Sequence, residues 1–547
     1  MNTPIPPRSL RRSRVAPLAL LTGAALVLAG CSGSAGAGSA NTDAAEAGEP
    51  VHGGTLRVAV GSDAGCIDPQ QVGNNDSIYS SRQLVDSLTD QDPETGEIVP
   101  WLAEGWEINE DATEFTFTLQ EGATFSNGDP VDAEAVAANL DRGVELGARA
   151  SLITSYLEGY SGTEIIDERT FTVTFDEPSA QFLQATSTHT LGILHPDSAA
   201  ASDDERCTGV IGSGPFVLEN YSPNEGSTFT AREDYDWGSS VWENTGAPYV
   251  DGIEFSIVPE SGVRAGSLQS GQVDLIGNIA PQDAAQLTGV GAQLLDRTNP
   301  GIAMGLRLNH DHEFLSDPLV REAITRGIDR EEIVDVTQVE GTPTATSVLS
   351  STTPGYTDVS EALEGDDETV ESLLAEAGFE QDSEGYWKRD GKRLSFEILW
   401  FNVAASNSAT VELIQQQLAG HGIEVTLQEG QVADWQNKLN EGDYDANLSN
   451  ITRADPDILR SEYHTDLKNQ SRLEASELDE LLDAQASEGD EEARNEIVAD
   501  AQRTIVENYR LVPVYDLTTV LAAGENVHGV HFDSGSRIHL SNTWIED

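Results

Sequence analysis

Lysine is scarce in this sequence, with four residues in a chain of 547, and only 30 residues are basic against 94 Asp and Glu. The formal net charge is therefore −64. A surface of this charge repels phosphate backbones, which excludes nucleic acid as a partner. The acids are spread along the chain and 38% of the residues are hydrophobic, which argues against disorder. We interpret the composition as that of a secreted, folded protein whose acidic surface keeps it in solution.

Motifs of hydrolases and nucleotide-binding enzymes are also missing. The chain has no G-x-S-x-G elbow, no H-E-x-x-H and no Walker A loop, since the pair Gly391-Lys392 is followed by Arg393. Paired carboxylates are frequent, but 94 acids produce such pairs by chance. We expect no catalytic residues, no cofactor and no enzyme activity, with a secreted hydrolase as the rival from another class.

The apolar run 17–30 has 14 residues and is too short to span a bilayer. Four arginines precede it, so residues 1–30 are predicted to be a signal peptide. The run ends in Leu28-Ala29-Gly30-Cys31, which resembles the bacterial lipobox. This resemblance implies that Cys31 is thioether-linked to diacylglycerol and becomes the mature N-terminus. The Gly/Ala/Ser-rich remainder of residues 31–50 is predicted to be a flexible tether at the cell membrane, on its extracytoplasmic face.

Cysteine is limited to Cys31, Cys66 and Cys207. Neither Cys66 nor Cys207 lies in a C-x-x-C or other zinc-like spacing. In an oxidising compartment the simplest prediction is one disulfide between them, and two buried thiols are the alternative.

Strand and helix patterns alternate along the remaining chain, whose length favours two or three cooperating lobes. Strands are predicted at 53–60, 114–119, 170–175, 303–309, 394–402, 423–429 and 511–516. Helices are predicted at 76–88, 129–144, 317–336 with a break at Gly327, 368–379 and 411–422. Residues 394–429 read as a β-α-β unit, which builds parallel sheets. The fold class is α/β.

Seven segments, in order, resemble the ABC-transporter extracellular solute-binding protein family 5, the oligopeptide, dipeptide and nickel-binding branch known as cluster C. Residues 100–136, PWLAEGWEINEDATEFTFTLQEGATFSNGDPVDAEAV, resemble its signature nearly residue for residue. The other segments are 53–71, 211–223, 267–276, 319–334, 373–379 and 505–516. A single string of this kind is weak, whereas seven in the family's order are strong.

The resemblance implies a two-lobe, periplasmic-binding-protein-like fold of type II with an accessory lobe. Lobe I is expected over 51–86, 206–300 and 516–547, the accessory lobe over 87–205, and lobe II over 301–515. Hinge strands are expected near 298–308 and 510–520. Closure of the lobes over a solute would present the closed form to the permease subunits of an importer. A monomer is expected.

Candidate ligand-binding residues follow from this arrangement, at strand ends and on the accessory lobe. They are Ser62, Asp63, Ile67, Asp68, Ser213 and Gly214 in lobe I, Tyr156 and Tyr160 in the accessory lobe, and Trp400, Phe401, Asn402, Thr452, Arg453 and Asp455 in lobe II.

The loop after residue 451 departs from the peptide-binding pattern. Peptide binders of the family place an aspartate four residues before a loop proline and a tryptophan three residues earlier, but here those positions hold Thr452 and Ser449. Asp455 could replace the aspartate only if the loop is shortened. Arg453 instead favours a carboxylate on the ligand. The alternative is a surface arginine paired with Asp455 or Asp457.

Two readings within the family stay open. A nickel or metallophore binder is the first, and His310-Asp311-His312 is the only tight histidine cluster, but a solvated loop is favoured there and no metal site is predicted. A solute-sensing receptor without transport is the second. The ligand could be a peptide, an opine, a glycoside or a metal chelate.

Overall fold

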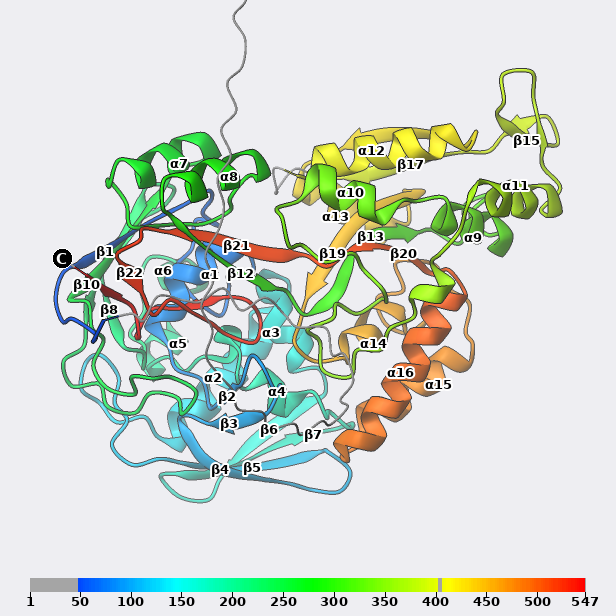
Figure 1. Ribbon diagram of the computed structural model, residues 1–547. Coiled ribbons are helices and arrows are strands. Elements are labelled where there is room, and N and C mark those ends of the chain that lie inside the picture. The colour runs from blue at the N-terminus through cyan, green and yellow to red at the C-terminus, as the bar shows by residue number, and fades with distance from the viewer. Residues whose placement is uncertain (1–47, 402–405, 547) are drawn as a thin grey trace, which may run out of the picture. The chain divides into compact units, whose positions relative to one another are not determined.

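The computed structural model describes residues 48–401 and 406–546, and most strands lie in three large sheets (Figure 1). The seven-stranded sheet is drawn from 55–60, 216–298 and 518–523, the four-stranded sheet from 103–175, and the five-stranded sheet from 301–515. These segments lie inside the ranges predicted for lobe I, the accessory lobe and lobe II. We keep those three names for the sheets with their helices.

Lobe I mixes parallel and antiparallel strands. Its order is β12 (Gln293–Thr298), β21 (Thr518–Ala523), β11 (Leu275–Ile276), β1 (Thr55–Val60), β10 (Gly252–Ile257), β9 (Gly226–Ala231) and β8 (Phe216–Ser222). The helices that follow its strands are α1 (Asn75–Ser81), α7 (Ser261–Gln269) and α8 (Pro281–Gly289). The parallel strands β10, β1 and β11 lie in the middle of the sheet, where apolar side chains of β1 are buried.

The accessory lobe is an antiparallel sheet with short helices. Its strand order is β4 (Ala103–Ile108), β5 (Glu114–Leu119), β7 (Thr170–Phe175) and β6 (Tyr160–Ile165). Its helices include α2 (Ala133–Glu145), α3 (Ser151–Tyr156), α4 (Phe182–Ala185) and α5 (Pro196–Ala200). The alternating strands β5 and β7 bury Phe115, Phe117 and Phe171 against Phe182, so the aromatic residues of the family signature form a core.

Lobe II contains the predicted β-α-β unit. Its strand order is β18 (Glu424–Glu429), β17 (Ser395–Trp400), β19 (Ala446–Thr452), β13 (Gly301–Leu308) and β20 (Leu511–Tyr515). Its helices are α9 (Pro318–Arg326), α10 (Arg330–Thr337), α11 (Asp367–Glu376), α12 (Asn407–Gly420), α13 (Val432–Glu441), α14 (Ile458–Tyr463), α15 (Glu477–Ser487) and α16 (Glu491–Glu507). β17 and β18 pair in parallel, with α12 connecting them. The α/β class is confirmed.

Helix ends differ from the periodicity by a few residues, for local reasons. α2 begins at Ala133 rather than near Pro130, because the Asp132 carboxylate accepts the N–H of Ala135 and caps the first turn. The helix predicted over 76–88 ends at Ser81, followed by a 3₁₀ turn to Leu84. In that turn the Gln83 amide donates to the Ile538 carbonyl, so a contact distant in sequence replaces the helical continuation.

Two short connections join lobes I and II, at residues 299–300 and 516–517, and they lie side by side. The Asn299 N–H donates to the Leu517 carbonyl at 2.7 Å. Its side-chain oxygen accepts from both the N–H and the hydroxyl of Thr519, at 3.0 and 2.8 Å. The two connections are therefore held together by one buried asparagine.

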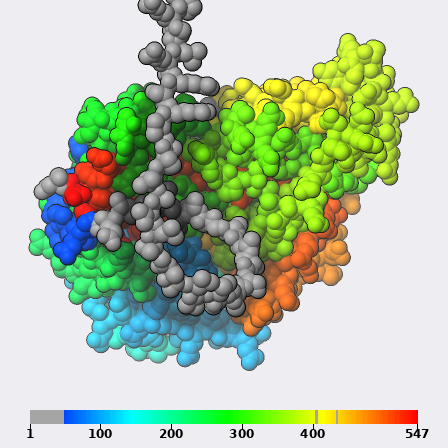
Figure 2. Space-filling model, in the orientation of Figure 1, coloured from blue at the N-terminus to red at the C-terminus, as the bar shows by residue number. Residues whose placement is uncertain are grey.

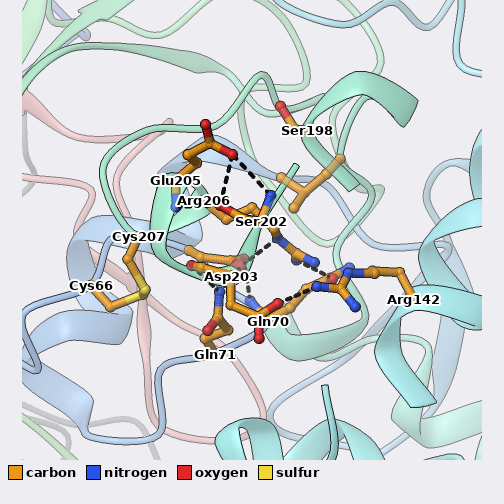
Figure 3. A network of polar contacts seen from close by, with 12 residues as sticks. Cys66, Gln70, Gln71, Arg142, Ser198, Ser202, Asp203, Glu205, Arg206 and Cys207 are labelled. Atoms are coloured by element: carbon orange, nitrogen blue, oxygen red, sulfur yellow. Dashed lines mark hydrogen bonds and ion pairs between the residues drawn. A yellow bond between two sulfur atoms is a disulfide. The ribbon is translucent and has the colours of Figure 1, made fainter. Parts of the chain in front are cut away.

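A buried ionic network lies where lobe I meets the accessory lobe, beside the Cys66–Cys207 disulfide (Figure 3). Arg206 and Asp68 are both fully buried and pair at 2.7 Å. The Arg206 guanidinium also donates to the Gln70 side-chain oxygen, and the Gln71 amide donates to Asp68 at 2.8 Å. The disulfide closes a segment of 141 residues, which links the first loop of lobe I to the far end of the accessory lobe.

The buried pair predicts a large loss of stability for Arg206→Gln. The substitution leaves the Asp68 carboxylate buried without its cation, and breaking such a pair costs about 3 to 5 kcal/mol. Thermal and urea unfolding of the full chain should show this loss. The control is Arg503→Gln, which removes an exposed arginine paired only with Asp500, and is expected to change the free energy of unfolding by under about 0.5 kcal/mol. Equal behaviour of the two variants would contradict the expectation.

Candidate functional site

The first loop of lobe I, residues 61–68, uses most of its polar groups internally. The Asp63 carboxylate accepts from the Tyr221 hydroxyl at 2.8 Å and from the Asn224 N–H at 2.8 Å. The exposed Ser62 donates to Asp76 at 2.9 Å. These bonds fasten the loop to α1 and to the β8–β9 hairpin, and Ser62 retains an exposed side.

Four of the predicted ligand contacts in lobe I are engaged in packing and hydrogen bonds within the fold. Ile67 is a core residue, and Asp68 is fully buried in its pair with Arg206. The buried Ser213 hydroxyl donates to the Ile193 carbonyl and accepts from the Asp86 N–H. The Gly214 N–H is used by the Leu84 carbonyl, and a Cβ at residue 214 would lie 2.5 Å from Leu84, so glycine serves a close backbone approach.

The aromatic candidates are not gathered in one place. Tyr160 lies in β6, where its hydroxyl donates to Asp141 of α2 at 2.7 Å. Trp400 is buried in the core of lobe II with its indole N–H unpartnered among the described residues. Phe401 packs on Trp435 of α13, with ring centroids 4.7 Å apart. The predicted contact Asn402 lies outside the described residues.

Arg453, one of the predicted ligand contacts, links lobe II to the accessory lobe. It follows the carboxyl end of β19, and its side chain is 4% exposed. Its guanidinium donates to the Gln181 side-chain oxygen at 3.1 Å and to the Ser155 hydroxyl at 2.6 Å, both in the accessory lobe. It also donates to the Ser461 hydroxyl at 3.1 Å, and it lies 4.6 Å from the centre of the Tyr156 ring. The structure therefore brings together Tyr156 and Arg453, two of the predicted ligand contacts.

The cation of Arg453 has no carboxylate partner within 4.0 Å among the described residues, and its Nε is buried without a hydrogen bond. The predicted alternative, a pair with Asp455 or Asp457, is therefore wrong. Burying a guanidinium among neutral oxygens costs free energy that an anion would offset. This arrangement suits a site that receives a negative group.

Asp455 has a different partner, which the sequence did not reveal. Its carboxylate accepts two hydrogen bonds from Arg494 of α16, at 3.0 and 2.7 Å. Asp457 accepts from the Gln485 amide of α15. Thr452 accepts from the Asn299 amide at 3.3 Å. Loop 452–457 is thus held by α15, α16 and the connection between lobes I and II, and both oxygens of Asp455 are engaged by Arg494.

A cavity of about 300 Å³ lies beside this loop and is lined by all three lobes. Its walls are residues 91–96, Arg297, residues 351–354, Ala454 and Ser534. The turn 91–96 joins β2 (Thr89–Gln91) to β3 (Ile98–Pro100). Except for Ala454, which adjoins Arg453, the sequence did not indicate these lining residues. No motif distinguishes their Ser, Thr and Pro residues from those of ordinary loops.

Lobe II contacts the accessory lobe at a second point. The Ala180 N–H donates to the Ala486 carbonyl at the end of α15, at 3.1 Å. Figures 1 and 2 show the orange α15–α16 segment against the blue and cyan segments of the accessory lobe. Together with the bonds of Arg453, this contact shows that the described conformation has lobe II seated on the accessory lobe.

The histidine cluster after β13 serves a turn. The His312 ring nitrogen accepts from the N–H groups of Phe314 and Leu315. Burial, aided by Arg321 and Arg510, lowers the pKa of His310 to about 3. Within the described part of the chain, no group of three or more His, Cys, Asp or Glu side chains is arranged to hold a metal ion.

Comparison with known proteins identifies the family. The model described as "Bacterial extracellular solute-binding proteins, family 5 Middle" matches residues 97–468. The chain belongs to this family. The resemblance noted in the sequence is thereby confirmed, and so is the periplasmic-binding-protein-like fold. Family 5 is a family of binding proteins rather than of enzymes.

Relatives in family 5 differ in what their names say they bind. The chain is 24% identical to the dipeptide-binding protein of Escherichia coli K12, over 85% of this chain and 90% of that protein. It is 26% identical to the nickel-binding periplasmic protein of the same strain, over 61% of this chain and 63% of that protein, which is less than two thirds of the relative's length. The crystal structure of NikA from Brucella suis in complex with Fe(III)-EDTA is 22% identical, with a TM-score of 0.78 over 90% of this chain and all of that one.

Among the described helices, none has the length and apolar character that a bilayer crossing requires. The predicted signal peptide, Cys31 and most of the predicted tether fall outside the described residues.

Asp457 gives the site loop a distinctive pH dependence. Burial, together with the charge of Asp455, raises the pKa of Asp457 to about 6, although Arg494 opposes the rise. The folded protein therefore holds this proton more tightly than the unfolded chain does. The contribution of protonated Asp457 to the free energy of unfolding is largest below about pH 4, and it is lost as the pH rises through the folded-state pKa of about 6.

Asp457→Asn should remove this contribution while keeping an oxygen for the Gln485 amide. Urea unfolding at pH values from 4 to 8 should show the variant gaining stability relative to the wild type as the pH rises, by up to about 3 kcal/mol. Asp500→Asn, at an exposed position of α16, is the control and should follow the wild type. A pH-independent difference for Asp457→Asn would rule out the raised pKa.

Proposed function

We propose that the mature protein is the lipid-anchored solute-binding component of an ABC importer, and that it captures a peptide-like solute between lobe II and the other two lobes. It performs no catalysis, works as a monomer, and delivers the solute to permease subunits. Membership of family 5 and the three-lobe architecture support this function. Relatives are named for binding dipeptides, glutathione and heme, and these names support a small organic solute.

The observation that carries the proposal is the environment of Arg453. A cation that is 4% exposed, and that bridges lobe II to the accessory lobe through neutral partners alone, leaves its charge to be balanced by a ligand carboxylate. The adjoining cavity of about 300 Å³ is at the lower end of the size range of small-molecule sites. Tyr156 offers a ring face beside the same cation.

A nickel or metallophore binder is the second candidate, because this chain is similar to a nickel-binding protein and to the NikA structure. A chelate with carboxylates would meet Arg453 as a peptide carboxylate does. A sensing receptor would need the same site, so binding experiments do not distinguish it from an importer component. The two are distinguished by measuring uptake of labelled solute in cells that contain or lack the partner permease.

Arg453→Ala should weaken binding at least tenfold, because the partner carboxylate of the solute would be buried without its cation. The full chain, purified without denaturation and incubated with a peptone hydrolysate, is assayed for retained small molecules by native mass spectrometry and then by titration. Arg503→Ala, an exposed arginine, is the matched control. An affinity within about twofold of the wild type would refute the assigned role of Arg453.

Cys31→Ser should abolish the lipid anchor. Expressed with its signal peptide in a bacterial host, the wild type is expected in the detergent phase of a Triton X-114 partition, with a diacylglycerol adduct on Cys31. The variant is expected in the aqueous phase without the adduct, and Ser32→Ala should behave as the wild type. A variant that stays lipidated in the detergent phase would contradict the assignment.

A further inference from the structure

A short segment of the accessory lobe, residues 180–181, contacts lobe II twice. The Ala180 N–H donates to the Ala486 carbonyl at the end of α15, at 3.1 Å. The side-chain oxygen of the next residue, Gln181, accepts from the Arg453 guanidinium at 3.1 Å, and Gln181 is buried. The end of α15 and the loop that carries Arg453 therefore meet the accessory lobe at the same place.

Ser155 of α3 adds a third hydrogen bond between these lobes. Its hydroxyl donates to the Leu152 carbonyl at 2.8 Å, so its lone pairs are free to accept, and it accepts from Arg453 at 2.6 Å. The centre of the Tyr156 ring lies 4.6 Å from the same guanidinium. These partners in the accessory lobe are all uncharged. Hydrogen bonds from one buried cation, rather than an ion pair, therefore join the two lobes here.

Each side of this junction is braced within its own lobe. In lobe II, Arg494 of α16 binds the Asp455 carboxylate and also donates to the Gln485 carbonyl of α15 at 3.1 Å. This ties the loop of Arg453 to the helix that ends beside Ala180. In the accessory lobe, Phe182 is fully buried in the aromatic core and fixes residues 180–181. We therefore expect the contacts between the lobes to break together, when lobe II moves as one body.

The same junction closes off the cation of the proposed site. A guanidinium has five N–H groups. In Arg453, Nη1 donates to Gln181 and Ser461, and Nη2 donates to Ser155. Nε has no partner among the described residues and is shut off from solvent. A carboxylate can bridge Nε and Nη2, but it reaches Nε only after lobe II has moved off the accessory lobe.

We propose that Ser155, Ala180 and Gln181 form a latch that holds lobe II on the accessory lobe in the absence of solute, and that release of this latch opens the site at Arg453. The inference rests on the proposed capture of a solute, and it adds a control of access that lies outside the connections between lobes I and II. Gln181 sets the strength of the latch, because an amide oxygen accepts a weaker bond from a guanidinium than a carboxylate does. Neutral acceptors also let the latch open without exposing an unpaired carboxylate.

The test measures the distance between the two lobes without any solute. The full chain carries Cys31→Ser, so that the two introduced cysteines are its only free thiols, and it keeps the Cys66–Cys207 disulfide. Spin labels are attached through Ile166→Cys in the accessory lobe and Glu492→Cys in α16, which are exposed positions outside the latch. After exhaustive dialysis, with native mass spectrometry to confirm that no small molecule remains, pulsed electron paramagnetic resonance gives the fractions of molecules with lobe II seated and lifted.

Four variants are compared with this labelled parent. Ser155→Ala and Gln181→Leu each remove one acceptor of the latch, and Gln181→Glu is added to Ser155→Ala to supply a charged acceptor. Ser151→Ala, an exposed serine of the same helix, is the matched control. Thermal unfolding of each variant checks that it is folded. If Gln181→Leu does not fold, Ser155→Ala with and without Gln181→Glu decides the matter.

The parent is expected to show mainly the short distance of the seated arrangement. Ser155→Ala and Gln181→Leu should each raise the ratio of lifted to seated molecules about tenfold or more, because each removes an acceptor of a charged donor. Gln181→Glu should reverse the effect of Ser155→Ala, since the carboxylate pairs with the Arg453 cation. Ser151→Ala should match the parent. Reversal by a charge at residue 181 is a response that a general loss of packing would not give.

Two results would overturn the latch. One is a ratio within about twofold of the parent in folded Ser155→Ala and Gln181→Leu, far below the effect of a lost charged hydrogen bond. The other is a parent that shows only the long distance. Either result leaves the proposed function standing, because that function is tested by retention of a solute and by its loss in Arg453→Ala. Failure to retain any solute would count against the proposed function and leave the distances unchanged.

Discussion

Asn299 is the residue on which the arrangement of the lobes depends. Its backbone and side chain bind Leu517 and Thr519, so the two connections between lobe I and lobe II meet at one point. Its amide also donates to Thr452, immediately before Arg453. The point where the two connections meet therefore lies beside Arg453, the cation of the proposed site. A site next to this point changes its geometry less on closure than a site at the rim would.

The acidic composition of the chain contrasts with the buried cation of Arg453. The chain as a whole carries a formal −64, which favours a dispersed, hydrated surface. Where lobe II meets the accessory lobe, Arg453 is buried without a carboxylate partner among the described residues. Arg206 is neutralised by Asp68 and Arg494 pairs with Asp455, whereas the buried Arg264 donates only to carbonyl oxygens. Arg453 differs from these arginines because its hydrogen bonds join lobe II to the accessory lobe.

The family signature marks the fold more than the ligand site. Its Phe115 and Phe117 pack in the accessory core, and Gly214 permits a close approach to Leu84. Such positions serve the fold, and a fold by itself does not determine what a protein binds. The proposed ligand contact Arg453 comes instead from loop 452–457, whose residues carry no family motif. This division explains how relatives named for dipeptides and for nickel share one architecture.

The sequence by itself determined the α/β class, the family, most strands and the approximate ranges of the helices, because alternation and helical periodicity report burial on a local scale. It also gave Arg453 and Tyr156 as separate candidate ligand contacts, and the structure brings them into contact. Only the tertiary structure decided that Asp68 pairs with Arg206 and Asp455 with Arg494. In the sequence, Arg206 lies 138 residues from Asp68, and Arg494 lies 39 residues from Asp455. Pairing of charges across such separations is set by packing rather than by any local pattern.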